Sequence, residues 1–296
     1  MITNKRHERM VSILLNTFFI LLSAVFIIPI LSVVFIAFTS ESSISREGYP
    51  FFFREIDLTA FKYIFDNPKT IVDAYKVTIL ISFGGTFLYL LLATMAAYVI
   101  SRPDFRYRKH ITFFFFFTML FNGGLVPTYI LMSQTLHLKN TYAAMIIPLL
   151  VNVWYLIMLK TFMADIPNEI IESARIDGAG HGTIYLRFIL PLSKPALATI
   201  GLLTLLDYWN SWQPAMLYID EKEMYPLQYM LQVMLRNIME ILKEMQNNIS
   251  LGGMENLPSE SARMAMCLLA VGPMLFIFPF FQKYFTRGLT VGAVKG

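Results

Sequence analysis

Charged residues are scarce in this sequence, and their scarcity excludes most kinds of soluble domain. Asp, Glu, Lys and Arg together make up only 15% of the chain, whereas hydrophobic residues make up 56%, including 26 Phe and 18 Met. This balance is typical of a protein embedded in membrane lipid. The net charge of +4 is small and spread along the chain, so we expect no nucleic-acid partner.

Cysteine and histidine are also rare, which limits redox and metal chemistry. Cys267 is the only cysteine, so no intramolecular disulfide can form, and its place in an apolar run predicts a small packing residue. Because the four histidines are scattered, they predict no metal site and no catalytic cluster: His7, His110, His137 and His181. We therefore expect no catalytic residue, no metal ligand and no enzyme activity.

The sequence also lacks the pattern GxxxxGK[ST]. That loop holds the phosphates of ATP through its backbone N–H groups and its lysine. The chain is therefore not expected to bind ATP by that route.

Long apolar runs dominate what is present. A helix needs ~20 mainly apolar residues to cross a hydrocarbon core of ~30 Å. Runs of this kind predict six transmembrane helices, over residues 11–38, 74–100, 111–133, 142–163, 196–219 and 263–281. We expect an all-α polytopic membrane protein, in which residues 1–296 form a single transmembrane domain.

Basic residues gather in the short segments that flank these runs. They precede the first run, link the second to the third, and follow the last: Lys5, Arg6, Arg9, Arg102, Arg106, Arg108, Lys109, Lys283, Arg287 and Lys295. The positive-inside rule places such segments in the cytoplasm. Both termini and the loop 165–195 are then predicted to be cytoplasmic. The loops 39–73 and 220–262, which carry more acids than bases, are predicted to lie outside.

The second of these outer loops contains an amphipathic pattern. Apolar residues recur at helical spacing between Leu227 and Leu242, among too many charges for a membrane span. The pattern predicts an outer or interfacial helix. Such a helix either packs on the transmembrane bundle or contacts a protein that delivers a solute.

Asp207 is the only acidic residue inside a predicted span, and it falls near the middle of the membrane. A charged group at that depth costs ~2.5 to 3.5 kcal/mol on insertion scales and usually faces a bundle interior or a cavity. Trp209 and Asn210 follow it closely. Two interpretations remain open: these side chains join helices through hydrogen bonds, or they line the path of a sugar-like solute.

Backbone-breaking residues interrupt the third and fourth predicted spans. The third contains Asn122-Gly123-Gly124 and Pro127, and the fourth contains Pro148 and Asn152. Interrupted backbone at membrane depth is tolerated only where protein or a water-filled cavity covers it. The breaks mark either ordinary use of Pro and Gly in spans or a translocation path. Together with the fifth span they give the candidate path residues, Asn122, Asn152, Asp207, Trp209 and Asn210.

The loop 165–195 is polar and punctuated by Gly and Pro. Pro167 is suited to begin a short helix, and Gly178 and Gly180 are suited to end it. A second short helix is predicted over residues 183–190. Helices shorter than ~12 to 15 residues are marginal alone in water, so this pair is expected to need a docking partner.

The same loop resembles the cytoplasmic EAA loop of ABC importer permeases. The resemblance rests on the spacing of Glu172-Ser173-Ala174, Asp177-Gly178-Ala179 and Leu190-Pro191, although Ser173 and Phe188 replace the usual alanine and isoleucine. Three further stretches resemble the carbohydrate-importing, MalG-like branch of these permeases, and within it the LplC-type group associated with oligosaccharides and polysaccharide fragments: FNGGLVPTYIL, WNSW and QKYFTRGLTVGAVKG.

The resemblance implies a type I ABC importer permease fold and a role in the bacterial cytoplasmic membrane. The chain would form half of the path for a carbohydrate, beside a second, different permease subunit. Two ATPase subunits would bind ATP and Mg, an external solute-binding protein would deliver the cargo, and this chain would bind no cofactor itself. The residues implied in coupling to the ATPase are Glu172, Ser173, Ala174, Asp177, Gly178, Ala179, Leu190 and Pro191.

Within that set, Glu172 would make a charge-assisted bond with the ATPase, and Gly178 would permit the turn between the two helices. The alternative is a secondary, ion-coupled solute transporter. Such transporters use ionisable residues inside the membrane, for which Asp207 alone is thin support.

Overall fold

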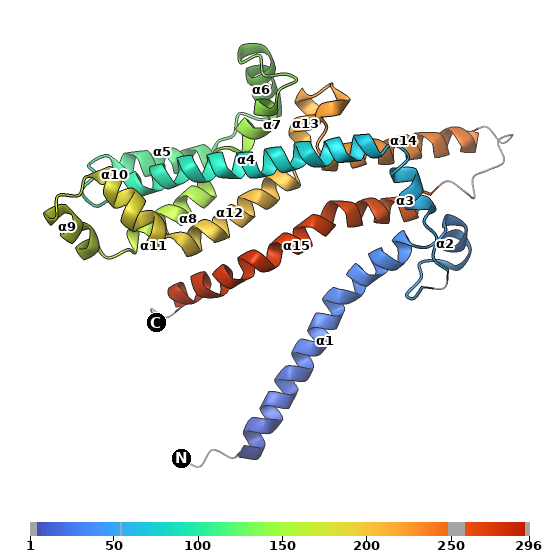
Figure 1. Ribbon diagram of the computed structural model, residues 1–296, viewed down its shortest axis with the longest axis horizontal. Helices are drawn as coiled ribbons and strands as arrows, with labels where there is room; N and C mark the ends of the chain where they lie inside the picture. Colours follow the sequence, from blue (N-terminus) through green and yellow to red (C-terminus); the bar gives the residue numbers. More distant parts are fainter. Residues whose placement is uncertain (1–4, 54, 248–257, 294–296) are drawn as a thin grey trace. The chain divides into compact units, whose positions relative to one another are not determined.

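Helices account for nearly all of the regular structure in this chain. The computed structural model describes residues 5–53, 55–247 and 258–293, and the described residues contain no β-strand (Figure 1). The chain divides into two units, each of which is described by itself. The larger unit contains Lys69–Met230 with Pro273–Gly296, and the smaller contains Met1–Pro68 with Leu231–Gly272.

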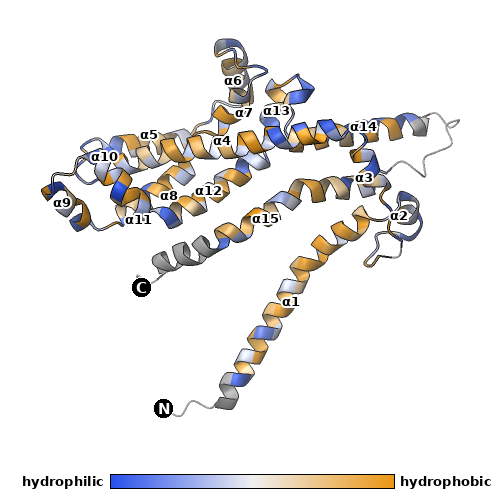
Figure 2. Cartoon of the chain, in the orientation of Figure 1, coloured by the Kyte–Doolittle hydropathy of each residue, from blue (hydrophilic) through white to orange (hydrophobic). Residues whose placement is uncertain are grey.

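Three continuous helices are long and apolar enough to cross a membrane. They are α1 (Lys5–Ala37), α4 (Pro68–Ser101) and α15 (Glu260–Ala293), and hydrophobic residues run along most of each one (Figure 2). The described residues reach six candidate spans only if three bent pairs of helices each count as one span.

The first two bent pairs correspond to the third and fourth predicted spans, and the third pair joins the end of the loop 165–195 to the fifth predicted span. Helix α5 (Arg108–Leu120) turns by 110° into α6 (Leu125–Ile130) and η1 (Leu131–Thr135). Helices α7 (Tyr142–Ile146) and η2 (Ile147–Leu149) turn by 54° into α8 (Val153–Ala164). The stretch His181–Leu192 turns by 77° into α12 (Lys194–Trp209). The third and fourth predicted spans are therefore each two helices, whereas the fifth predicted span begins within α12, after the third bend.

The first bend lies at the predicted break. Gly124 has φ +89°, a left-handed conformation that side chains other than glycine rarely adopt, and it directly precedes α6. The side-chain oxygen of Asn122 accepts a hydrogen bond from the Gly124 N–H at 2.8 Å. The Asn-Gly-Gly sequence therefore supplies both the turn conformation and a local partner for one freed backbone group.

Two tyrosines of the larger unit satisfy carbonyl groups freed by the second bend. The Tyr208 hydroxyl donates to the Ile146 carbonyl at 2.9 Å, and the Tyr89 hydroxyl donates to the Asn152 carbonyl at 2.9 Å. Both tyrosine side chains are almost fully buried. Because lipid offers no alternative partner to a broken helix, these bonds make the bend tolerable at membrane depth.

Gly85 on α4 provides the space that the Tyr208 ring occupies. A Cβ atom added at Gly85 would lie 2.5 to 2.7 Å from three atoms of that ring, whereas a Cβ at Gly84 would meet nothing within 4 Å.

We expect Gly85→Ala to destabilise the protein by ~1 to 3 kcal/mol through overpacking. Gly84→Ala is the matched control and should be neutral or slightly stabilising. Thermal unfolding of the purified chain in detergent measures both, and equal melting temperatures for the two variants would contradict the close approach.

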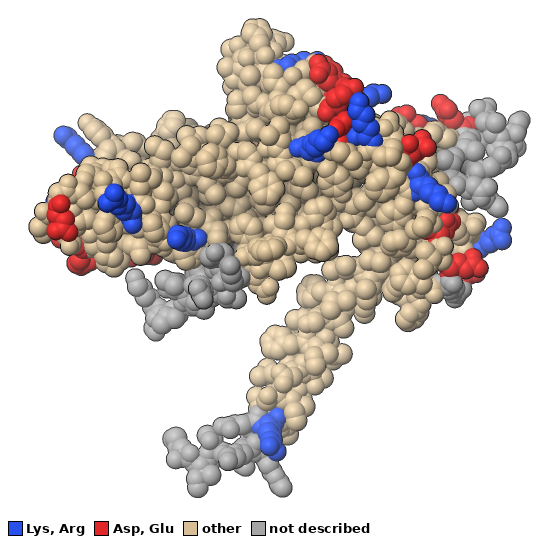
Figure 3. Space-filling model, viewed as in Figure 1, with Lys and Arg blue, Asp and Glu red and all other residues tan. Residues whose placement is uncertain are grey.

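The core of the larger unit joins α4 and α8 to the loop 165–195. Small residues on α4, Ala93 and Ala97, lie in one cluster with Leu159 and Met163 of α8 and with Ile184. In the space-filling view the middle of α4 and α5 carries no charged side chain, and charges appear at the end that carries α9 (Asn168–Ile176) and α10 (His181–Ile184) (Figure 3). An apolar belt bounded by charge is the surface expected of a membrane-embedded bundle.

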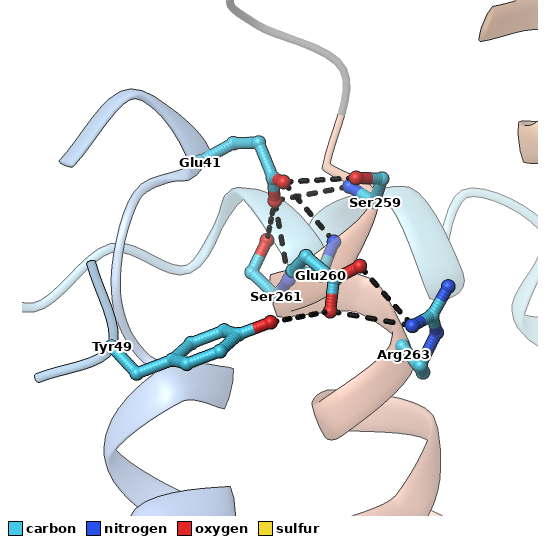
Figure 4. Close-up of polar contacts among 6 residues, drawn as sticks. All are labelled: Glu41, Tyr49, Ser259, Glu260, Ser261 and Arg263. Atoms are coloured by element: carbon cyan, nitrogen blue, oxygen red, sulfur yellow. Dashed lines mark hydrogen bonds and ion pairs between the residues drawn. The ribbon is translucent and has the colours of Figure 1, made fainter. Parts of the chain in front are cut away.

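In the smaller unit, the Glu41 carboxylate caps the first turn of α15. Glu41 begins α2 (Glu41–Glu47) and accepts hydrogen bonds from the N–H groups of Ser259, Glu260 and Ser261 at 3.0 to 3.1 Å (Figure 4). The hydroxyls of Ser259 and Ser261 also donate to it, each at 2.9 Å. The cap satisfies N–H groups that have no partner within the helix, and it places a negative charge at the positive end of the helix dipole.

This cap gives a pH-dependent prediction. Burial raises the pKa of Glu41, but the bonds from Glu260, Ser261 and Ser259 outweigh burial and hold that pKa below its usual value. The stabilisation is therefore present above the ordinary glutamate pKa and is lost as pH falls through the lower folded value.

At neutral pH we expect Glu41→Gln to speed amide hydrogen exchange at 259–263 about tenfold, since bonds to a charged acceptor are worth ~1.5 to 3 kcal/mol. Mass spectrometry measures this exchange. The exposed Glu55→Gln is the control, and equal rates in the two variants would count against the cap.

Several local expectations differ from the structure. Pro167 directly precedes α9 (Asn168–Ile176) rather than forming its first residue, because its ψ of 130° is extended and not helical. The second short helix begins at His181, earlier than predicted. Cys267 is exposed rather than packed. The tail after the last predicted span continues α15 to Ala293.

The amphipathic pattern in the loop 220–262 does form a helix, α14 (Leu227–Asn247). Its first residue, Leu227, is fully buried and donates its N–H to the Thr78 hydroxyl at 2.8 Å. Thr78 in turn donates to the Ala74 carbonyl at 2.9 Å. One side chain of α4 therefore caps the beginning of α14 within the larger unit.

Candidate functional site

Two cavities lie within the larger unit, at the bends of the broken spans. The first has a volume of about 710 Å³ and the second of about 660 Å³. Four residues line both: Asn122, Pro148, Leu149 and Asp207. Because Asn122 lies at the first bend and Pro148 just before the second, the same breaks that interrupt the helices form the shared wall.

Asp207 is the only charged residue in the described linings of these two cavities. It projects from α12 and is exposed, and the Tyr155 hydroxyl of α8 donates a hydrogen bond to it. A carboxylate with one protein donor still has free acceptor positions. Asp207 can therefore join α8 to α12 and still accept a hydrogen bond from a solute in the cavity.

The candidate asparagines hold local structure as well as facing the cavities. Asn152 accepts hydrogen bonds from the N–H groups of Trp154 and Tyr155, and so caps α8. The Asn210 amide donates to the Leu206 carbonyl at 3.0 Å. Asn122 and Asn210 line the first cavity, and Asn122 and Asn152 line the second.

Trp209 is placed differently from the other four candidate path residues. Its side chain is only 2% exposed, and the neighbouring Trp212 lines the first cavity instead. The sequence did not single out Gln213 or Tyr155, which line the first cavity and bind Asp207 respectively. No local pattern marks Tyr155, because its partner lies on a helix distant in the chain.

Within the loop 165–195, helix α9 has one face packed in the core and one face exposed. Ile171 and Ala174 are each 4% exposed and pack in the core of the larger unit. Glu172 and Ser173 are exposed, and Ile176 is 86% exposed. An isoleucine held in the open at the end of an anchored helix is suited to contact with another protein.

Gly178 makes the turn after α9. Its φ is +79°, its N–H bonds to the Arg175 carbonyl at 3.0 Å, and the Ala179 N–H bonds to the Ala174 carbonyl at 2.9 Å. This is the left-handed glycine ending that many helices use. After it the chain is helical again through α10 (His181–Ile184), η3 (Tyr185–Ile189) and α11 (Leu190–Leu192), which contains Pro191. Asp177 is exposed and directly precedes the turn.

No group of three or more His, Cys, Asp or Glu residues in the described part of the chain is placed to hold a metal ion.

Comparison with known proteins identifies the family. No family model matches the chain. It is 33% identical over 290 residues to the polygalacturonan/rhamnogalacturonan transport system permease protein YtcP of Bacillus subtilis, covering 98% of this chain and 99% of that protein. It is 34% identical over 276 residues to protein LplC of the same organism, covering 92% and 90% respectively.

A solved structure has the same fold. A chain of a bacterial ABC transporter involved in the import of the acidic polysaccharide alginate superposes with a TM-score of 0.79 at 26% identity, covering 96% of this chain and all of that one. The chain belongs to the family of sugar ABC importer permeases, as its EAA-like loop and the three further carbohydrate-importer-like stretches predicted. It is therefore a multi-pass integral membrane protein and a transport permease, not an enzyme, and an ion-coupled transporter is not favoured.

Proposed function

We propose that this chain is one of two different membrane subunits of an ATP-driven oligosaccharide importer, with a type I fold, six spans and both termini in the bacterial cytoplasm. Three continuous helices, the bent pairs at 108–135 and 142–164, and the segment 196–219 that begins in α12 would supply the six spans. The basic residues at the chain ends and between the second and third spans support the orientation. The loops 39–73 and 220–262 then face the solute-binding protein.

The main support for this proposal is that α9 has one buried face and one exposed face. Its buried residues anchor it to the bundle, and its exposed residues, Glu172, Ser173 and Ile176, are free to dock in a cleft of an ATPase subunit. Glu172 would accept a charge-assisted hydrogen bond there, and Ile176 would bury its side chain. Two ATPase subunits, which bind the ATP and Mg, would engage this chain and its companion permease.

The two cavities form this subunit's share of the path. Their volumes lie in the range of ~300 to 1,000 Å³ that is usual for small-molecule sites, and amide, carboxylate and indole groups line them. Such groups suit sugar hydroxyls and sugar rings. Because YtcP is named for polygalacturonan and rhamnogalacturonan transport, fragments of these polymers are the first cargo to test.

Photo-cross-linking in the complete transporter tests the docking directly. A photoreactive residue at Ile176 is expected to cross-link to the ATPase subunit, because this side chain is exposed beside Glu172. The matched control is Leu58, another exposed apolar residue, in the predicted outer loop. Cross-linking from Leu58 to the ATPase, or none from Ile176, would overturn the proposal.

A further inference from the structure

We propose that Arg102 and Asp104 are positioning residues that brace the loop 165–195, so that movement of α9 is passed to α4. The inference rests on the proposed function, because it concerns how ATPase movement reaches the membrane helices. The brace consists of the segment 98–104 and its contacts with α8, α9 and α10. All of these parts lie within the larger unit.

Arg102 anchors the brace to the end of α8. Its side chain is buried, at 4% exposed, and its Nη2 donates to the Met163 carbonyl at 2.7 Å. Its Nε and Nη2 also donate to the Ser101 hydroxyl at 3.2 and 3.1 Å, and its guanidinium lies 5.5 Å from the centre of the Tyr98 ring. Met163 lies in the last turn of α8, where carbonyls have no partner within the helix and a cation is favourable.

A buried guanidinium is costly unless its hydrogen bonds are well placed. The described structure gives Arg102 no carboxylate partner, so carbonyl, hydroxyl and ring contacts hold it. Lysine can carry the same charge but cannot reach the carbonyl, the hydroxyl and the ring with one planar group. The geometry is therefore specific for arginine.

Asp104 connects the same segment to α9. Its carboxylate lies 2.6 Å from the Arg175 guanidinium, which belongs to the last turn of α9. The hydrogen bond from Arg175 holds the pKa of Asp104 below its usual value, so the pair is charged at neutral pH. The two side chains are 51% and 40% exposed, and exposed pairs stabilise folding by only ~0 to 1 kcal/mol. The pair therefore matters for where α9 lies more than for whether the protein folds.

Tyr98 makes the third connection, to the beginning of α10. Its hydroxyl lies 3.2 Å from Nδ1 of His181. One turn earlier on α4, the Thr94 and Tyr185 hydroxyls lie 2.7 Å apart. Together, the end of α4 and the residues just after it are therefore bonded to helices on both sides of the Gly178 turn, through Tyr98 and Thr94 after the turn and through Asp104 before it.

These contacts leave α9 little freedom to move independently of α4. Further along α4, Tyr89 holds the Asn152 carbonyl and Gly85 receives the Tyr208 ring, next to Asp207. A shift of α9 would therefore displace the helix that supports the cavity wall. Coupling of this kind is measured as an interaction between two residues.

Charge reversal provides that measurement. The complete transporter is reconstituted in proteoliposomes with Asp104→Arg, with Arg175→Asp, or with both changes. Uptake of labelled polygalacturonan and rhamnogalacturonan fragments is compared with the amount of ATP hydrolysed, and ATPase co-purification reports assembly. Each single change should lower uptake per ATP at least about fivefold while assembly is retained, since functional coupling of this kind is typically 5- to 150-fold. The double change restores opposite charges and should recover most of the ratio.

Two further variants complete the test. Arg106→Asp reverses an exposed arginine two residues beyond Asp104 and should leave the ratio unchanged. Arg102→Lys should lower the ratio although it keeps the charge, and a wild-type ratio in this variant would overturn its part in the brace.

The remaining outcomes separate the two proposals. Single reversals that couple normally would overturn the brace, as would a double change that recovers nothing, because Arg175 would then act on the ATPase directly. Wild-type proteoliposomes that show no ATP-dependent uptake would overturn the proposed function, and the brace with it.

Discussion

Glu172→Lys is expected to remove nearly all ATP-driven uptake while the chain still inserts in the membrane. Glu172 is exposed on α9, whereas its neighbours Ile171 and Ala174 are buried, so the change leaves the core of the larger unit intact. Losing a charge-assisted bond costs ~1.5 to 3 kcal/mol, and the new lysine adds repulsion from the cation that Glu172 is proposed to meet. We therefore expect uptake in proteoliposomes to fall by two orders of magnitude or more, at roughly 1.4 kcal/mol for each tenfold change.

Glu169→Lys is the matched control, because Glu169 is an exposed glutamate in the first turn of the same helix. Its variant should retain most of the uptake. If Glu172→Lys transports at the wild-type rate, or if both variants lose uptake equally, Glu172 is not a specific docking contact.

Asp207→Leu is expected to lower uptake about tenfold or more, with little loss of complex assembly. The change removes the one carboxylate from the described linings of both cavities. It also leaves the hydroxyl of the half-buried Tyr155 without its acceptor, and losing one such hydrogen bond costs ~1 kcal/mol. Since Asp207 itself is exposed, leucine meets no steric obstacle there.

Asp207→Asn separates the two interpretations of this residue. Asparagine keeps an oxygen that can accept from Tyr155 but removes the charge. If Asp207 lines the path, the Asn variant should assemble normally and transport at an intermediate rate. Equal loss of assembly and uptake in the Leu variant would instead show that Asp207 only holds α8 to α12.

Features fixed by local chemistry were predictable from the sequence. The apolar runs gave the positions of the long helices, and the amphipathic pattern after residue 226 gave α14. Gly178 was expected to end α9 because its backbone conformation suits glycine alone, and its φ is +79°. The Asn122-Gly123-Gly124 sequence predicted the position of the first bend for the same reason, and Gly124 has φ +89°.

The size of each bend was not predictable, because tertiary contacts determine it. The 54° turn between the two halves of the fourth span depends on Tyr89 and Tyr208, which belong to other helices and satisfy carbonyls at its two sides. Neither tyrosine differs in sequence from an ordinary aromatic residue of a span. The same holds for Tyr155, whose bond to Asp207 exists only after α8 and α12 pack together.

The burial of Arg102 was another feature that could not be predicted from the sequence. In the sequence it was one of several basic residues that set orientation, and nothing local distinguished it from Arg106. The structure buries Arg102 at 4% exposed against the end of α8 and leaves Arg106 exposed. One of the contacts that hold it there, the hydrogen bond to the Met163 carbonyl, comes from a helix about sixty residues later in the chain.

ATP dependence of uptake tests the central claim most directly. The chain is reconstituted with its companion permease and ATPase subunits, ATP is supplied on the ATPase side, and the loaded solute-binding protein is added on the other side. Uptake of labelled oligosaccharide should require ATP and should continue when ionophores collapse the proton and sodium gradients. Uptake that persists without ATP and stops when the gradients collapse would contradict the account.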